Sequence, residues 1–153
     1  MKVSPPLRKE DDRKALIKGI KDGYIDVIVS DHKPEDEESK RLPFAQAAEG
    51  SIGIETLLSL ALELYHNQSL PLKKIIETIT CNPARILKIN KGNKGNLKKG
   101  SDADLCIFDL NEPWKVDVSK LKSKSKNAAI ENRKLQGRVL MTYLKGESVF
   151  SLQ

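Results

Sequence analysis

The sequence lacks a long apolar run. Its longest apolar stretch, residues 52–65, is interrupted by Glu55 and Glu63, whereas a membrane-spanning helix needs about 20 consecutive, mostly apolar residues. The first residues, Met1 to Ser4, lead directly into a proline pair and lack the apolar core of a secretory signal. We therefore expect a cytoplasmic protein that has no membrane partner.

Cysteine and histidine are both scarce. The two cysteines, Cys81 and Cys106, lie far apart and have no CxxC partner, so we expect buried, reduced thiols and neither a disulfide nor a metal site. This pattern agrees with a cytoplasmic location. The two histidines are His32 and His66. We expect His66 at the surface, because it ends an amphipathic segment.

Aromatic residues make up only 5% of the chain, although the net charge is +6. A single-stranded nucleic-acid site combines basic residues with aromatic side chains on which bases stack. Here the lysines are spread along the chain, and the densest group, residues 115–126, has no nearby set of aromatics. We therefore predict a solvated basic loop and no nucleic-acid partner.

The first half of the chain, up to about residue 90, alternates helical and strand-like segments. Apolar spacing predicts helices over residues 11–22, 54–66, 72–80 and 83–87, and the β-branched run 25–30 predicts one buried strand. Strands that alternate with helices indicate an α/β fold with a parallel sheet. Two or three such strands cannot close a barrel, so the first half reads as part of a larger fold.

The second half is strand-like. Residues 103–110, 135–144 and 148–150 predict an antiparallel piece, whose last two strands join in a hairpin at 145–147. The glycine- and lysine-rich segment 91–100 separates the halves. We therefore divide the chain into residues 1–91 and 92–153.

Six motifs, in order along the chain, resemble one enzyme family, and the last of them, in the tail, consists of two segments. They are the K-x-S-P-P-L-R segment at 2–8, a strand ending in Asp-His at 26–32, G-I-E-T at 53–56, N-P-A-R at 82–85, G-S-D-A-D-L at 100–105, S-K-S-K-N at 123–127 and L-Q-G-R-V at 135–139. The G-x-x-A-D-L and N-P-A segments resemble amidohydrolases broadly. The P-P-L-R and S-K-N segments resemble dihydroorotases within that superfamily.

The resemblance implies a fold and an activity. Dihydroorotases are zinc-dependent hydrolases with a (β/α)₈ barrel and a small β-sandwich, and they interconvert dihydroorotate and N-carbamoyl-L-aspartate in pyrimidine biosynthesis. By this resemblance, residues 1–91 are the last part of the barrel. Residues 92–153 are the C-terminal portion of the sandwich and the tail.

The resemblance also assigns site residues. Asp31 would contact the metal and act as general acid and base, while Ser4, Glu35, Glu49 and Gly50 would take the substrate-binding positions. Many active members carry Asn at the position of Ser4 and His at that of Glu35. His32 would be an oriented loop histidine, because neighbouring residues on a strand point to opposite sides.

By the resemblance, the remaining zinc ligands of the family would lie before the first residue of this sequence. A catalytic zinc takes three protein ligands, so we expect the chain alone to bind zinc weakly and to be inactive. A first hypothesis is therefore a C-terminal dihydroorotase fragment that works with an N-terminal barrel part or as a homo-oligomer on a small-molecule substrate. An alternative is a noncatalytic assembly module, for example a companion of aspartate carbamoyltransferase, and a third is a decayed remnant.

Overall fold

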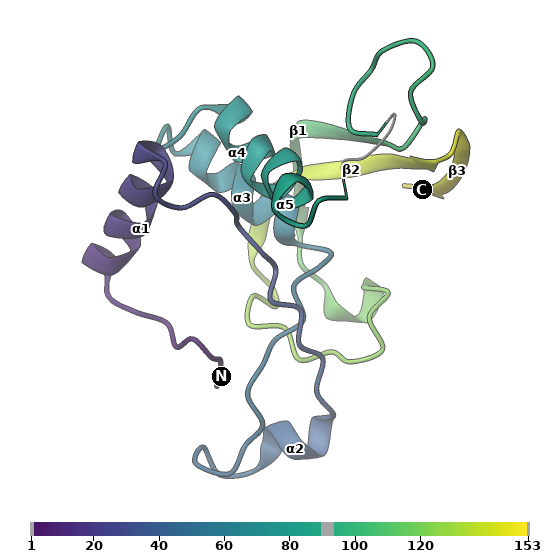
Figure 1. Ribbon diagram of the computed structural model, residues 1–153. Coiled ribbons are helices and arrows are strands. Elements are labelled where there is room, and N and C mark those ends of the chain that lie inside the picture. The colour runs from purple at the N-terminus through teal and green to yellow at the C-terminus, as the bar shows by residue number, and fades with distance from the viewer. Residues whose placement is uncertain (1, 90–93, 153) are drawn as a thin grey trace.

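The computed structural model describes residues 2–89 and 94–152. Figure 1 shows most of the helices gathered beside a small sheet, with long loops extending away from both and one short helix carried on these loops. The elements, in chain order, are α1 (Glu10–Asp22), α2 (Glu37–Arg41), α3 (Leu57–His66), α4 (Leu72–Ile79), α5 (Cys81–Ile86), β1 (Leu105–Lys115), a 3-10 turn (Val118–Lys120), β2 (Lys134–Leu144) and β3 (Glu147–Ser151).

The predicted helices are confirmed, with shifts of a few residues at their ends. Helix α1 carries three acidic residues in its first turn, where they complement the helix dipole. It ends at Gly23, whose φ of +83° is the left-handed conformation typical of a glycine C-cap.

Helix α2 lies between the predicted strand 25–30 and the predicted helix 54–66, in a polar segment for which the sequence predicted no helix. The Asp36 carboxylate caps it by accepting a hydrogen bond from the Ser39 amide at 2.7 Å. That amide is also the main cause that lowers the pKa of Asp36. An aspartate three residues before a serine was the available signal for this short helix.

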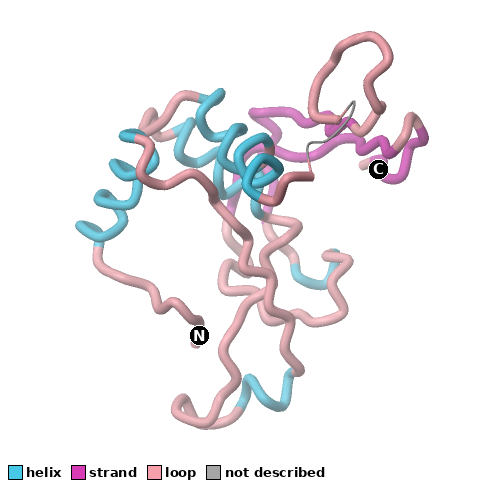
Figure 2. Tube along the Cα trace, in the orientation of Figure 1, coloured by secondary structure: helices cyan, strands magenta, loops and turns pink. Residues whose placement is uncertain are grey.

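The predicted strand at 25–30 does not form among the described residues, and that prediction is wrong. The segment is extended, but its backbone contacts are isolated: the Ile28 amide donates to the Thr78 carbonyl at 3.1 Å, and His32 forms a single parallel bridge with Ser51. A strand needs a continuous hydrogen-bonded neighbour. β-branched composition alone cannot supply one, so the predicted parallel sheet is replaced by paired loops (Figure 2).

The antiparallel piece of the second half is confirmed. Three strands follow the order β1-β2-β3, with Leu105 opposite Tyr143 and Lys115 opposite Lys134 in the first pair. The hairpin between β2 and β3 turns at Lys145 and Gly146, both of which have positive φ as tight hairpins require.

The core lies where α3 meets α4 and β2. Leu62 and Ile75 are fully buried, and Ala61 is nearly so. Trp114 of β1 ties the helix to the sheet, because its indole N–H donates to the Ser59 hydroxyl and to the Gly137 carbonyl, each at 3.1 Å. Helix α3 therefore packs on the sheet through Ser59 and Leu62, which both lie against Gly137.

Three expectations about single residues and boundaries have different outcomes. Cys81 and Cys106 are free, as predicted, but exposed and not buried, because neither contributes to the core. His66 is half-buried, and its Nε2 is shielded from solvent, so its predicted surface position is wrong. The predicted division between residues 91 and 92 lies outside the described residues.

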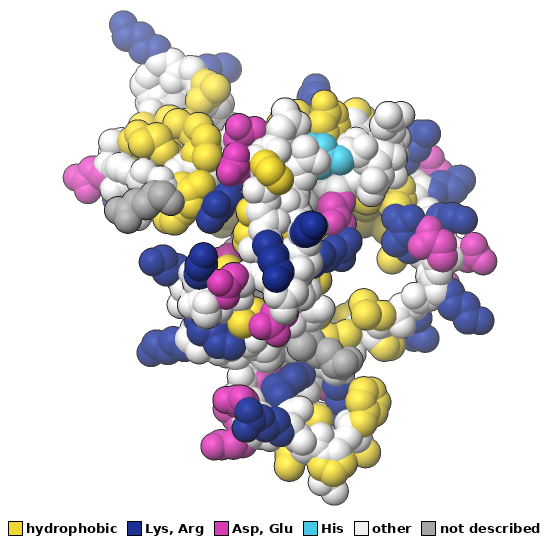
Figure 3. Space-filling view, turned by 180° about the vertical axis from the view of Figure 1, so that it is seen from behind, with side chains coloured by type: hydrophobic (Ala, Val, Ile, Leu, Met, Phe, Trp, Pro, Cys, Tyr) yellow, Lys and Arg dark blue, Asp and Glu magenta, His cyan; other side chains and the backbone are white. Residues whose placement is uncertain are grey.

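The predicted solvated basic loop is confirmed, since its lysines are exposed. In the face shown in Figure 3, Lys and Arg side chains are spread among acidic and hydrophobic ones. Among the residues that the structure describes, no helix has the length and apolar character of a membrane span.

Candidate functional site

Asp31 ends the extended segment that follows α1. Its side chain is exposed, and within the described residues its carboxylate accepts no hydrogen bond. Its φ of +44° is uncommon for a residue other than glycine, although Asp tolerates it better than most. Such local strain often accompanies a functional position. The carboxylate is therefore free to accept a proton or to bind a cation.

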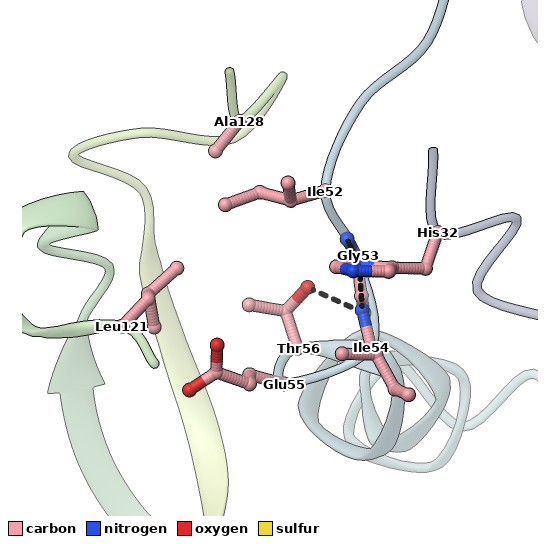
Figure 4. Close-up of a pocket in the computed structure, with 8 residues that line it drawn as sticks. All are labelled: His32, Ile52, Gly53, Ile54, Glu55, Thr56, Leu121 and Ala128. Carbon is pink, nitrogen blue, oxygen red and sulfur yellow. Dashed lines mark hydrogen bonds between the residues drawn. The ribbon is translucent and has the colours of Figure 1, made fainter. Parts of the chain in front are cut away.

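His32 is fixed immediately beside it. Its Nδ1 accepts hydrogen bonds from the backbone amides of Gly53 and Ile54 at 3.2 and 3.4 Å, as Figure 4 shows. Because Nδ1 is an acceptor, the proton of the neutral ring lies on Nε2. His32 is thus the oriented loop histidine that the sequence predicted, and it anchors the chain on one side of Asp31.

The junction around His32 is packed. Gly53 is required there, because a Cβ on it would lie 2.7 Å from the Ser30 carbonyl oxygen. The side chains drawn in Figure 4, which include Glu55 and Leu121, leave a cavity of only about 0 Å³ between them, so no water-sized space remains. This junction positions Asp31 and leaves no room for a ligand.

A larger groove lies next to it. It has a volume of about 310 Å³ and an apolar lining from the extended segment, including Ile28 and Val29, and from α3, including Leu57, Leu60 and Leu64. Val29 is 70% exposed. The groove is therefore an uncovered apolar surface and not a pocket lined with polar groups.

The four predicted substrate-binding residues differ in exposure. Ser4 is exposed, and Glu35 and Glu49 are half-buried. Gly50 is buried, with a φ of +135°, and a Cβ there would lie 2.8 Å from the Lys33 carbonyl oxygen. Their contact with substrate remains a prediction.

Backbone contacts bring three of these positions together. The Gly50 amide donates to the carbonyl of Lys2, two residues before Ser4, at 3.2 Å. The Glu35 amide donates to the side-chain oxygen of Asn127 at 3.3 Å, and the amide nitrogen of Asn127 donates to the Gly50 carbonyl at 3.3 Å. The structure therefore joins the N-terminal segment, the loop after Asp31 and the loop before α3.

Two residues that organise these loops had no assigned role in the sequence. Asn127 ends the S-K-S-K-N segment and Lys40 lies in α2, but their partners lie up to 94 residues away. A lysine at the end of a short helix and an asparagine in a tail give no local signal of such contacts. Only the three-dimensional structure reveals them.

A carboxylate is a suitable zinc ligand, and Asp31 is available to serve as one. The described residues 2–89 and 94–152 contain no group of three His, Cys, Asp or Glu side chains that could hold a metal ion. The ring nitrogen Nδ1 of His32 is already engaged by two amides. These residues therefore fit one position of a metal site and do not complete its ligand set.

The described chain resembles about one third of the chain of two hydantoinase-type enzymes. It superimposes on the L-hydantoinase (dihydropyrimidinase) of Arthrobacter aurescens with a TM-score of 0.88 and 32% identity, covering 99% of this chain and 35% of that one. The dihydropyrimidinase of Brevibacillus agri shares the fold with a TM-score of 0.89 at 23% identity, covering 98% of this chain and 33% of that one.

The family is equally clear from sequence. The model of the Amidohydrolase family matches residues 3–149, so the chain belongs to the amidohydrolase family. It is 46% identical to the dihydroorotase of Ehrlichia chaffeensis, covering 99% of this chain and 33% of that protein. It is 44% identical to the dihydroorotase of Acetivibrio thermocellus, with 97% and 34% covered. The predicted resemblance is thus confirmed, and the chain spans about a third of the length of these relatives.

Proposed function

We propose that this chain is part of a cytoplasmic dihydroorotase, a cyclic amide hydrolase that interconverts dihydroorotate and N-carbamoyl-L-aspartate in pyrimidine biosynthesis. The observation that carries the proposal is the Asp31 carboxylate, which is exposed, free of hydrogen bonds among the described residues and fixed by the neighbouring His32. The relatives named dihydroorotase, which are 46% and 44% identical to this chain, support this choice of reaction.

Asp31 supplies the proton transfers of this reaction. In ring opening, the oxygen of a water molecule attacks the carbonyl carbon of the ring amide, and the bond from that carbon to the ring nitrogen breaks. The Asp31 carboxylate accepts a proton from the attacking water and then donates it to the departing nitrogen. Ring closure reverses these steps. We place Ser4, Glu35, Glu49 and Gly50 around the substrate.

Zinc is the proposed cofactor of the assembled enzyme, where it would lower the pKa of water and polarise the carbonyl. The described residues supply Asp31 as one ligand, and a catalytic zinc needs three from protein. We therefore propose that the other ligands come from polypeptide beyond these 153 residues. The chain alone would then lack tight zinc binding and turnover.

Reconstitution tests this function. The purified chain is mixed with a polypeptide containing the other two thirds of the Ehrlichia chaffeensis dihydroorotase, and hydrolysis of dihydroorotate is followed by ultraviolet absorbance with and without zinc. We expect turnover only in the zinc-loaded mixture. Asp31→Asn should abolish it, whereas Asp26→Asn, an exposed aspartate on the same extended segment, should not. Absence of turnover in the mixture, or full activity of Asp31→Asn, would contradict the proposal.

The uncovered groove supports a second candidate, a noncatalytic assembly module. Its apolar lining and the 70% exposure of Val29 resemble a surface that another polypeptide covers. For this candidate, the proposed partners are a second copy of the chain or an aspartate carbamoyltransferase. Light scattering at micromolar concentration should show a dimer or larger, and a stable monomer would remove the support for self-association.

A further inference from the structure

The ammonium group of Lys40 has an unusual set of partners. It donates hydrogen bonds to three backbone carbonyls, those of Lys2, Ala48 and Gly50, at 3.1, 2.8 and 2.9 Å. Lys40 is half-buried, and no carboxylate lies within ion-pair distance of it among the described residues. An ammonium has three N–H donors and no acceptor, so these three carbonyls use all of its hydrogen-bonding capacity.

Asn127 makes a matching set of contacts from the tail. Its Nδ2 donates to the carbonyls of Lys33 and Gly50 at 3.4 and 3.3 Å, and its Oδ1 accepts from the Glu35 amide at 3.3 Å. Its own carbonyl accepts from the Ile52 amide at 3.2 Å. The side chain therefore joins the two loops that flank α2 to the C-terminal part of the chain.

The two side chains meet at one atom, the Gly50 carbonyl oxygen. Through it they form a connected unit, here called the Lys40–Asn127 clasp. The four candidate substrate positions are Ser4, Glu35, Glu49 and Gly50. Each of them either makes a contact in the clasp or lies within two residues of a residue that does. Ser4 is two residues from Lys2, Glu49 lies between Ala48 and Gly50, and the Glu35 amide is a direct partner of Asn127.

We propose that Lys40 and Asn127 are positioning residues, which act together through the Gly50 carbonyl to hold the four candidate substrate positions in one arrangement. This inference rests on the proposed function for the identity of the substrate. The clasp itself rests only on the contacts above. Neither side chain touches Asp31, so the clasp serves binding and not proton transfer.

Hydrogen exchange of the full chain, measured by NMR, tests whether the clasp is one unit. The Gly50 amide reports the Lys40 side, because it donates to Lys2, and the Glu35 amide reports the Asn127 side. Lys40→Met keeps a side chain of similar length but removes all three donors. Asn127→Asp keeps an acceptor for the Glu35 amide but removes both donors.

The informative results are the cross effects. Lys40→Met should raise exchange of the Glu35 amide, which Lys40 does not touch, and Asn127→Asp should raise exchange of the Gly50 amide. We expect increases of about tenfold or more, the change typical of losing a hydrogen bond to a charged group. Changes confined to each side chain's own partners would overturn the inference.

Two controls separate these effects from general loss of structure. Lys14→Met removes an exposed lysine of α1 and should leave both reporter amides unchanged. The amides of β2 should keep wild-type exchange in every variant. If Lys40→Met fails to fold, Asn127→Asp and its effect on Gly50 still decide the question.

Kinetics of the reconstituted enzyme test the positioning role. Both variants should raise KM for dihydroorotate by about tenfold, with kcat changed by no more than about twofold, because interactions shared by ground and transition states set KM alone. A fall in kcat at constant KM would overturn the positioning role while leaving the proposed function intact. If the unmodified assembly has no turnover, the proposed function is wrong, and the exchange result alone supports or overturns the clasp.

Discussion

Replacing Gly137 with alanine should place a methyl group against a side chain that cannot move away. Gly137 lies in β2 with a φ of +95°, and a Cβ there would be 2.4 Å from the Leu62 Cδ1 and 3.4 Å from the Leu110 carbonyl oxygen. Leu62 has 0% exposure. Leu62 belongs to α3 and packs against β2, so relief of the clash requires that the helix shift away from β2.

Two costs combine in this variant. A left-handed conformation costs a residue with a Cβ about 1–2 kcal/mol, and overpacking a filled core costs about 1–3 kcal/mol. The free energy of unfolding should therefore fall by about 2–5 kcal/mol. For a chain of this length, this corresponds to a Tm lower by about 4–20 °C.

Gly23→Ala is the matched control. Gly23 has a similar φ of +83°, but a Cβ there would have nothing within 4 Å, so only the conformational cost of about 1–2 kcal/mol applies. Urea unfolding followed by circular dichroism measures both variants. Equal losses would refute the clash with Leu62, and no loss in either would refute the conformational cost as well.

Three further outcomes follow from contacts elsewhere in the chain. Trp114→Phe removes the indole donor to Gly137 and should lower the free energy of unfolding in urea by about 1 kcal/mol; an unchanged value would contradict this contact. Glu55→Gln weakens an acceptor of the amides at 122–123, so exchange at those amides should accelerate, and equal rates would count against it. The pKa of Asp104 is lowered, mainly by a hydrogen bond from the Lys145 backbone amide and next by one from the Lys94 side chain. The ionised carboxylate therefore stabilises the fold at a pH above its ordinary pKa of 3.8, and this contribution is lost as the pH falls through the lower pKa of the folded state. The stability of Asp104→Asn should therefore depend less steeply on pH in acid unfolding experiments, and identical pH profiles would rule out this contribution.

Features fixed by neighbouring residues could be predicted from the sequence. Helix α1 follows from apolar spacing and the glycine at its end, and the hairpin at 145–146 follows from its turn residues. These elements form from contacts within a few positions, so a local pattern contains the needed information.

Features that depend on distant partners could not be predicted in the same way. The β-branched run 25–30 predicted a strand, yet pairing requires a neighbour that the described chain does not place alongside it. The position of Asp31 at the end of that run was predicted, whereas the contacts of Lys40 and Asn127 were missed. Their partners are set by tertiary structure, which periodicity does not encode.

The long sequence separation between Asn127 and its partners also bears on when these contacts can form during folding. Asn127 reaches Lys33 across 94 residues, and closing so long a loop is entropically unfavourable until other contacts have brought its ends together. During synthesis, the loops around Gly50 leave the ribosome before the residue that fastens them has been translated. The contacts of Asn127 with these loops therefore form only after the loops have been synthesised, whereas the contacts of Lys40 with Ala48 and Gly50 span 10 residues or fewer and do not wait for the tail.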